Sequence, residues 1–446
     1  MISNQITAFL KQASLSAKLS NKIAETVTMT AMFITPKGQY KAIGVVKFME
    51  QADFAGRRSE LYQIKCRFQP GVYFNQIVPY RDDLICQLIT QSESDRVMRE
   101  FVAIPQTDKD VRSESNSNIN NNLDALDTTN LVSYEFQLMD KGFAKLRNLP
   151  YSNIHAMANI RDTLMTVMEE GSQQARLTGY DAYKGLSMHE PIDNTNKYRQ
   201  ILIPSGTRFI DVPFFLQNHN EYGVYSKGLG AFYKQRYWWI YPLYNTNRVD
   251  THPRPIDLIR VPQNKIPDLD STFYMSATAL TIISTGEGEH NDQADIRKQN
   301  EGVGQRIVMG DAIAGDTGYH YNNGRAITTR ADTLQEYKLS DRRNGDEWVP
   351  LNPNPTGNLM VPLSENAKNE GEIVIVEWRN GDTGYLEPGH PLRYHYLYDD
   401  DTMMIRKGVL LGYRTDYVPI TDSITPHMKR TTKLVLFLKR QEKYKA

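Results

Sequence analysis

The nine histidines are the side chains best suited to metal binding or acid–base chemistry, and they are scattered along the chain. His189 is followed by Glu190, which begins like a zinc motif. No second histidine lies at helical spacing, however, and Pro191 comes next, so the HExxH arrangement is absent. We therefore interpret His189 as a loop histidine and not as a metal ligand.

A second histidine group, His390 and His395, lies shortly before a run of three aspartates at 399–401. A calcium loop needs oxygen ligands that alternate around a glycine, and the sequence DDDTMM does not provide that spacing. The alternative is a pair of strand histidines beside a solvated acidic turn. We favour the strand interpretation, and we predict no metal site and no cofactor.

Motifs for nucleophilic or phosphate chemistry are missing from the sequence. It contains neither the GxxxxGK[ST] phosphate loop nor the GxSxG nucleophile elbow, and the glycines of STGEGEH neighbour glutamates that repel phosphate. Paired carboxylates for glycoside cleavage depend on three-dimensional arrangement, so that enzyme class stays open. We predict no catalytic residue, and the sequence favours a structural or assembly protein over an enzyme.

Composition and charge narrow the class of protein. Basic and acidic residues both number 52, and the zero net charge argues against a dedicated nucleic-acid binder, which needs a basic excess. Cys66 and Cys86 form no CxxC pair and fall in strand-like patterns, which predicts buried thiols. The sequence has no signal-peptide core and no apolar run of about 20 residues. We expect folding in the cytoplasm without a membrane anchor.

The most aromatic stretch, residues 209–244, must be positioned by a larger body. Asp211 suits the N-cap of a short helix, and Gly223 suits a left-handed residue that ends it. The aromatic runs 230–233 and 237–241 flank a polar corner and predict a β-hairpin. A unit this small cannot bury its rings alone. We predict that it packs on the rest of the chain, on another subunit, or on both.

Five side chains of this stretch are candidates for an interface with another subunit. A tryptophan pair could stack sugars or bases, but more often one ring lies in the core and the other at an interface. The 26 tyrosines support an interface, because tyrosine combines a rigid apolar ring with one polar atom. The candidate interface residues are Phe214, Phe215, Tyr222, Trp238 and Trp239.

Alternating polar and apolar residues at both ends of the chain predict β-sheet, in the form of a small barrel or a sandwich. Residues 152–170 have helical spacing, residues 291–314 are a weaker helical candidate, and the corner Asn380-Gly381 predicts a hairpin. The result is a β-rich α+β fold in five parts. These are an N-terminal β domain at 1–105 that begins with a short helix or arm, a polar linker at 106–130, an α/β insert with the helix-hairpin at 131–245, a mixed, loop-rich region at 246–365, and a C-terminal β domain at 366–446.

The order of these elements resembles that of the tail or baseplate hub proteins of tailed bacteriophages. The segments AIGVVKFMEQADFAG and ELYQIKCRFQPGVYFNQIVPYRDDLICQLI are similar to the amino-terminal tube domain of that family. The stretch IPSGTRFIDVPFFLQNHNEYGVYSKGLGAFYKQRYWWIYPLY resembles its segment in which a helix ending in Tyr-Gly leads into a hairpin. EPGHPLRYHYLYDDDTMMIRKGVLLGY is similar to its closing β domain, whereas residues 315–370 have no counterpart.

The resemblance implies a homotrimer whose subunits each carry two tail-tube-like antiparallel β-barrel domains around the α/β insert. Three subunits would form a ring of six similar domains. One side would meet the sixfold tail tube protein, and the other would seat a trimeric cell-puncturing tail spike among other baseplate proteins. The ring would conduct passing DNA without binding it specifically. It would have no catalytic residue, and its location would be the virion tail, assembled in the host cytoplasm.

Two alternatives remain at this point. The chain could be another structural component of the tail, such as a tube, distal-tail or baseplate-wedge protein, for which sixfold or twelvefold rings are expected. From a different class, it could be a cell-wall-degrading enzyme with β carbohydrate-binding units.

Overall fold

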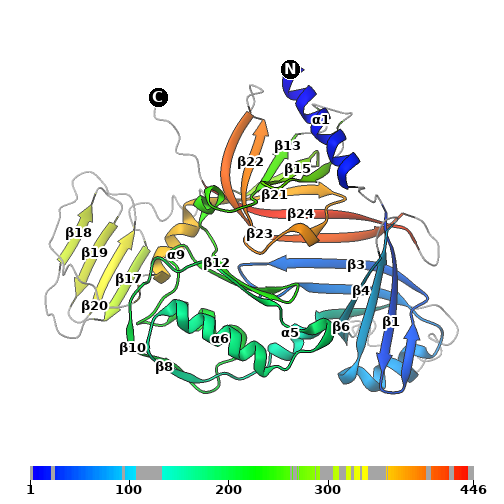
Figure 1. Ribbon diagram of the computed structural model, residues 1–446, viewed down its shortest axis with the longest axis horizontal. Helices are drawn as coiled ribbons and strands as arrows, with labels where there is room; N and C mark the ends of the chain where they lie inside the picture. Colours follow the sequence, from blue (N-terminus) through cyan, green and yellow to red (C-terminus); the bar gives the residue numbers. More distant parts are fainter. Residues whose placement is uncertain are drawn as a thin grey trace, which may run out of the picture.

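The largest element of the fold is one continuous β-sheet that curves into two barrels (Figure 1). This computed structural model confirms the β-rich α+β fold, and fifteen of the strands it describes belong to that sheet. It describes residues 4–21, 26–92, 96–106, 133–261, 264, 269, 271–286, 288–291, 305–310, 318–322, 326–331, 334–339, 358, 360–397, 403–420 and 426–439. The predicted acidic turn at 399–401 and all but the first residue of the predicted linker at 106–130 lie outside these ranges.

The first barrel is built from strands that the alternating pattern predicted. In its first strand every second side chain is buried, among them Met29, Ala31 and Phe33. Cys66 and Cys86 lie in the same core as buried free thiols, which confirms their prediction. The strands are β1 (Thr28–Thr35), β2 (Gly38–Lys41), β3 (Gly44–Asp53), β4 (Leu61–Arg67), β5 (Ile85–Gln91), β6 (Arg96–Pro105) and β7 (Ser133–Asp140), with the short helices η1 (Tyr73–Ile77) and η2 (Val78–Asp83) between β4 and β5.

Two strands from the other end of the chain close the first barrel. β23 (Met403–Pro419) pairs with β3, and the start of β24 (Met428–Lys439) meets the residue before β1. Val27 and Met428 exchange two backbone hydrogen bonds of 2.9 and 2.8 Å. β7 pairs with β4 and β6, so the first β domain extends beyond the predicted range 1–105.

The second barrel shares β23 and β24 with the first. Its strands follow the path β14–β15–β13–β22–β23–β24–β21–β16. β16 follows β15 after three residues, and β15 also contacts β21, which brings the two ends of this path together. β13 is parallel to both β15 and β22 because each partner is reached by a crossover, so this barrel is not purely antiparallel as expected. The remaining strands are β13 (Ile256–Arg260), β14 (Thr272–Met275), β15 (Leu280–Ser284), β16 (Gly288–Asn291), β21 (Gly371–Arg379) and β22 (Pro391–Leu397).

β23 changes partner where it passes from one barrel to the other. It pairs with β22 up to Val409 and with β3 from Gly412 onward. Its register against β24 shifts between Leu410 and Gly412, so Leu411 is the extra residue of a β-bulge. A Cβ atom on Gly412 would lie 2.4 Å from the carbonyl oxygen of Ala52, so only glycine allows this close approach.

The insert runs between β7 and β13 and contains both predicted secondary structure types. The helix predicted at 152–170 is wrong at its start, where residues 153–158 form β8, which pairs with β10. The helix begins at Ile160 because the Asn159 side chain accepts a hydrogen bond of 2.7 Å from the backbone N–H of Asp162. The elements are α5 (Lys141–Leu146), β8 (Asn153–Ala158), α6 (Ile160–Gln174), η3 (Gly179–Asp181), β9 (Gly185–Met188), β10 (Tyr198–Ile203), η4 (Phe209–Asp211), α7 (Val212–Asn218), β11 (Leu229–Lys234) and β12 (Tyr237–Pro242).

The loop-rich region 246–365 contains more regular structure than expected. A small antiparallel sheet, yellow at the left of Figure 1, has the order β17–β20–β19–β18. β17 overturns the helical interpretation of 291–314 for its own six residues. The elements are η5 (Thr246–Asp250), β17 (Gln305–Gly310), β18 (Gly318–Asn322), β19 (Ala326–Ala331), β20 (Leu334–Leu339) and α9 (Met360–Asn369).

The corner at Asn380 turns the chain, but it does not form the predicted hairpin. β21 ends there with both edges already paired, to β24 and to β16. The chain continues through η6 (Thr383–Tyr385) to β22, which pairs with β23 and β13 instead. Asn380 adopts the left-handed φ of 56° that Asn-Gly turns favour, so the turn prediction is right and the pairing prediction is wrong.

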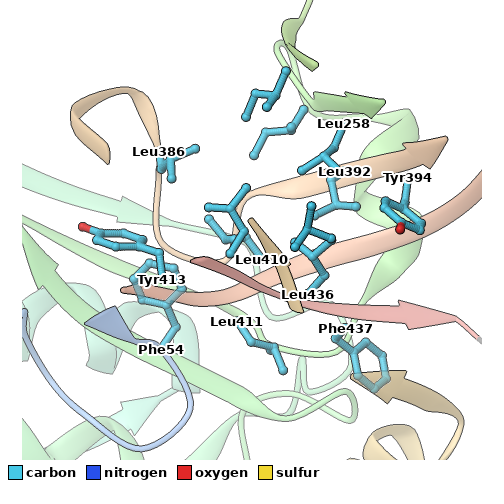
Figure 2. Close-up of a cluster of buried hydrophobic side chains, with 14 of the residues drawn as sticks. Phe54, Leu258, Leu386, Leu392, Tyr394, Leu410, Leu411, Tyr413, Leu436 and Phe437 are labelled. Carbon is cyan, nitrogen blue, oxygen red and sulfur yellow. The ribbon is translucent and has the colours of Figure 1, made fainter. Parts of the chain in front are cut away.

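Each barrel has its own hydrophobic core. Figure 2 shows part of the second core, where Leu392, Leu410 and Leu436 from three neighbouring strands point toward one another. Phe54, next to β3, reaches this core from the first barrel. The predicted amino-terminal helix is present as α1 (Asn4–Asn21), and no described helix is long and apolar enough to cross a membrane.

The bulge in β23 provides a test of the shared-strand architecture. We expect Gly412→Ala to lower the free energy of unfolding by about 1–3 kcal/mol, because the new Cβ would overlap the backbone of β3. Gly38→Ala is the matched control, since its Cβ would meet only the Tyr40 side chain at 3.5 Å. Urea denaturation measures both variants, and equal small effects would contradict the close contact at Gly412.

Candidate functional site at the three-way junction

The predicted aromatic hairpin is confirmed as β11 and β12, and it forms a layer between two bodies. Its two-residue turn, Gln235 and Arg236, has the positive φ values of 52° and 72° that a tight hairpin requires. One face packs in the core of the insert, and its members are Ala231, Tyr233, Trp238 and Ile240. The other face packs against the second barrel through Phe232, Trp239 and Tyr241.

The hairpin also contacts the first barrel. Tyr233 bridges to Ser59, and its backbone N–H donates to the carbonyl of Arg58 at 2.8 Å. Because one hairpin joins the insert and both barrels, we call this region the three-way junction. The insert and the two barrels form the larger body that buries the aromatic rings of the hairpin.

The five candidate interface residues occupy different environments. Trp238 is fully enclosed, with its ring centroid 5.7 Å from that of Phe209, so within one chain it is a core residue. Tyr222 is also buried, whereas Trp239, Phe214 and Phe215 are half-buried against the cores. A contact of these half-buried rings with another subunit stays a prediction.

The start of the short helix α7 differs from the predicted capping. Asp211 occupies the N-cap position, but its side chain makes no capping hydrogen bond. Its carboxylate instead accepts from Arg208 at 2.8 Å and lies 3.6 Å from Arg58. The Arg58 guanidinium lies 3.3 Å from the ring centroid of Phe214, so Arg58 ties α7 to the first barrel. Gly223 is left-handed, at φ 100°, as predicted, but it lies five residues beyond the end of the helix at Asn218, so the prediction that it ends the helix is wrong.

Lys234, the last residue of β11, is the central charge of the junction and is only 4% exposed. Its ammonium donates three hydrogen bonds of 2.8 Å, to the carbonyls of Thr383 and Leu386 and to the hydroxyl of Tyr413. Its Nζ also lies 3.3 Å from a carboxylate oxygen of Glu60. One side chain therefore joins the insert hairpin to the first barrel and to two segments of the second.

The hydrogen bonds around Tyr413 indicate which carboxyl group carries a proton. Tyr413 has a single hydroxyl hydrogen, which it donates to Glu60 in a short hydrogen bond, while its oxygen accepts from Lys234. The Glu50 carboxyl lies 3.2 Å from the same hydroxyl and accepts from Thr383 at 2.9 Å. Tyr413 has one hydrogen for two carboxyl groups, so we predict that Glu50 carries a proton, which would let both contacts be hydrogen bonds.

The electrostatics of the two glutamates agree with this hydrogen count. Burial raises the pKa of Glu50, and the nearby Arg99 offsets only part of that effect. Burial would also raise the pKa of Glu60, but Lys234 and the hydroxyls of Tyr413 and Tyr62 outweigh it and lower the pKa. Burial and the neighbouring groups thus favour the neutral form of Glu50 and the ionised form of Glu60, which is paired with Lys234.

Sequence reasoning missed this charged group. Lys234 was assigned to the polar corner of the hairpin, where a lysine is expected to be exposed. The length of the hairpin loop was the signal in the sequence that could have placed Lys234 correctly. A two-residue turn at Gln235 and Arg236 places Lys234 inside the strand, on a hairpin otherwise made of aromatic and apolar residues.

A second polar cluster joins the segment after the hairpin to the second barrel. His252, Glu387 and His390 each offer a ligand atom within 4.8 Å of the others, which is close enough to consider a metal ion. His390 is buried in the turn before β22, so its prediction as a strand histidine is wrong. His395 lies on β22, and His189 lies in a loop after β9; both predictions are confirmed.

The hydrogen bonds of this cluster favour protons over a metal. His390 Nε2 donates to the carbonyl of Arg254 at 2.6 Å, and its Nδ1 accepts from the backbone N–H of Glu387 at 3.3 Å. His252 Nδ1 accepts from the backbone N–H of Arg254 at 3.2 Å, and its Nε2 faces the Glu387 carboxylate at 3.4 Å. Each imidazole lone pair is therefore already occupied. We call these three side chains the histidine clasp.

Comparisons with known proteins give similar overall arrangements at very low sequence identity. No protein-family model matches the chain, and no curated protein matches its sequence. The crystal structure of the 43 kDa tail protein of prophage MuSo2 from Shewanella oneidensis is similar over 91% of this chain and 98% of that one, with 9% identity and a TM-score of 0.45.

Two further solved structures have a comparable extent of similarity. The tail protein from Neisseria meningitidis MC58 matches over 92% of this chain and 96% of that chain, with 10% identity and a TM-score of 0.39. The half-lidded Francisella PdpA-VgrG complex matches over all of this chain and 66% of that chain, with 10% identity and a TM-score of 0.36. Because all three TM-scores are below 0.5, a functional proposal for this chain has to rest on its own geometry.

The charge assignment at the junction predicts unequal effects of similar substitutions. Lys234→Met should lower the free energy of unfolding by about 3–5 kcal/mol, because it leaves the enclosed Glu60 carboxylate without its cation. Glu50→Gln should change it by less than about 1 kcal/mol, since a neutral amide replaces a neutral carboxyl group. Chemical denaturation at pH 7 measures both. A loss for Glu50→Gln as large as that for Lys234→Met would show that Glu50 is ionised.

The histidine clasp predicts a loss of stability in mild acid. Burial, which outweighs the attraction of Glu387, lowers the pKa of His390 to about 4. A histidine with a lowered folded-state pKa destabilises the fold as the pH falls below its unfolded value of about 6.5, here by about 2 kcal/mol between pH 7 and pH 5. Urea titrations at both pH values should show this loss in the wild type. It should be missing in His390→Gln, and an unchanged loss in that variant would assign the titration to another group.

Proposed function

We propose that this chain is a structural component of a bacteriophage tail and, within the tail, the trimeric hub that connects the tail tube with the cell-puncturing spike. The observation that supports the proposal is the pair of β-barrels joined side by side through β3 and β23 (Figure 1). Two barrels in each subunit are what a threefold protein needs to present six similar units to a sixfold tube.

The way in which the barrels are joined suits a ring under mechanical load. Covalent continuity and a run of backbone hydrogen bonds between β3 and β23 resist separation of the two barrels within a subunit. A sheet that curves into barrels also exposes fewer free strand edges than two separate open sheets, which limits irregular association of copies during assembly. Both properties favour an assembly of defined symmetry.

The chemistry of the junction also supports a structural role over a catalytic one. Glu50 and Glu60, the carboxyl groups with the most distinctive surroundings, bind Lys234 and hydroxyl groups of the same chain. In these contacts, opposite charges and hydrogen bonds hold the insert and the two barrels together. In the proposed hub the zero net charge of the chain would let DNA pass without strong binding. The proposed partners are the tail tube protein, the spike and other baseplate proteins of the virion.

The symmetry of the assembled protein tests the proposal. Native mass spectrometry and particle imaging of the purified chain, alone and with its spike partner, should give a complex of three copies. Rings of six or twelve copies would replace the hub by another tail component, such as a tube, distal-tail or wedge protein. A monomer that degrades peptidoglycan, and loses that activity when one Asp or Glu is replaced, would replace it by an enzyme.

The tryptophan pair separates assembly from folding. We expect Trp239→Ala to weaken trimer formation by about 2–4 kcal/mol while the single chain stays folded, as for an aromatic anchor at an interface. The matched variant Trp238→Ala should destabilise the fold by about 3–5 kcal/mol, because that ring is fully enclosed. Concentration-dependent mass measurements report assembly, and circular dichroism reports folding. If Trp239→Ala also unfolds the chain, Trp239 belongs to the core alone.

A further inference from the structure

The amino-terminal helix α1 packs on the second barrel, although the strand that follows it belongs to the first. Leu10 is fully buried in a small apolar cluster whose other buried members, Ile259, Val261, Leu269 and Ile283, all come from the second barrel and its adjoining segments. Figure 1 shows the dark blue helix beside β13 and β15. Its closest neighbour is β14, at one end of the large sheet. The helix is therefore an arm that extends from one barrel to the other.

The helix does not completely fill its seat, which is the surface of β14 and β15 on which it packs. A cavity of about 340 Å³ lies between the helix and β14–β15, and it is lined by Ala13 and Ala17 on one side and by Phe273 and Ile283 on the other. Phe9 borders the same cavity and is 61% exposed, and Leu15 is 60% exposed. Large apolar side chains on both sides of one helix suit a position between two bodies, where each side is covered.

We propose that, in the assembled ring, α1 packs on the second barrel of a neighbouring copy of the chain and so acts as an exchanged arm. This inference rests on the proposed trimeric hub. In a ring of alternating barrels, every first barrel has a second barrel on each side, its own and that of the next subunit. The occupant of the seat on β14 is then the α1 helix of another copy, and the contacts are those already present within one chain.

The length of the connection sets the geometry of the exchange. Only residues 22–25 separate α1 from Thr26, and five steps along an extended chain span at most about 17 Å. The exchanged seat must therefore lie at the barrel–barrel contact between adjacent subunits. Phe9 and Leu15 would face that contact, which gives a reason for two exposed apolar side chains on an otherwise polar helix surface.

Cysteine cross-linking distinguishes an α1 helix that packs on the second barrel of its own chain from one that packs on the second barrel of a neighbouring copy. Ala13 and Tyr274 both line the cavity between helix and barrel, and neither is fully buried, so the double variant Ala13→Cys/Tyr274→Cys places one accessible thiol on each side. The natural Cys66 and Cys86 are buried, and burial raises the pKa of both thiols, so a bis-maleimide reagent should leave them unmodified. Leu15→Cys/Tyr274→Cys is the matched control, with the helix thiol on the exposed side.

The number of copies in the untreated sample is measured first. Denaturing electrophoresis of the cross-linked products then shows whether the arm is exchanged. If the protein forms no trimer, the proposed function fails. If it forms a trimer, exchange predicts that most of the Ala13→Cys/Tyr274→Cys product runs as covalent dimers and trimers, and that the control gives little product. A trimer whose product runs as an internally linked monomer, or gives no cross-link at all, overturns the exchange and leaves the hub proposal intact.

Co-expression gives an independent measurement of the same point. Two differently tagged chains, one with Ala13→Cys and the other with Tyr274→Cys, each hold one half of the pair. A cross-linked product that contains both tags requires the arm of one chain to lie on the barrel of the other. Mixed trimers that form without such a product would contradict the exchange.

Discussion

The architecture depends on one backbone constraint, the change of partner within β23. At the bulge of Leu411, this strand leaves β22 of the second barrel and joins β3 of the first, and the close approach of Gly412 to Ala52 makes the change sterically feasible. The beginning of β24 then completes the first barrel through Met428 and Val27. The two barrels share strands and cannot separate as independent domains. Any rigid ring made from this chain would obtain its stiffness within the subunit from this shared pair.

The insert is fixed to this frame by an aromatic layer and a buried charge. The hairpin of β11 and β12 covers the insert core with one face and the second barrel with the other, so neither face can be solvated without loss of apolar burial. Lys234 lies at the end of this aromatic layer, where the insert hairpin meets the first and the second barrel. Its desolvated ammonium is tolerated because three oxygen acceptors and the Glu60 carboxylate surround it. A protonated Glu50, which its raised pKa favours, would avoid a second negative charge in the same enclosed space.

Local patterns predicted those parts of the fold whose physical causes are local. Alternation in residues 28–35 gave the buried face of β1, and the runs around Gln235 gave the aromatic hairpin. Predictions failed where a distant partner decides the structure. Residues 153–158 follow helical spacing but pair with β10, and the Asn380 turn leads away from a hairpin because both edges of β21 are occupied. Of the candidate interface residues, sequence identified the aromatic stretch, while the structure separated the enclosed Trp238 from the half-buried Trp239.

The sequence by itself determined a β-rich chain of zero net charge with buried thiols, an aromatic hairpin and no recognisable catalytic motif. Each of these follows from residue type and short-range spacing, which act through backbone preference and side-chain solvation. Only the tertiary structure decided that the first and last strands complete a common barrel, that Lys234 lies inside and not at an exposed corner, and that His390 is held in a buried turn. These features depend on contacts between residues hundreds of positions apart, and the energy of such a contact exists only when the chain has brought both partners together.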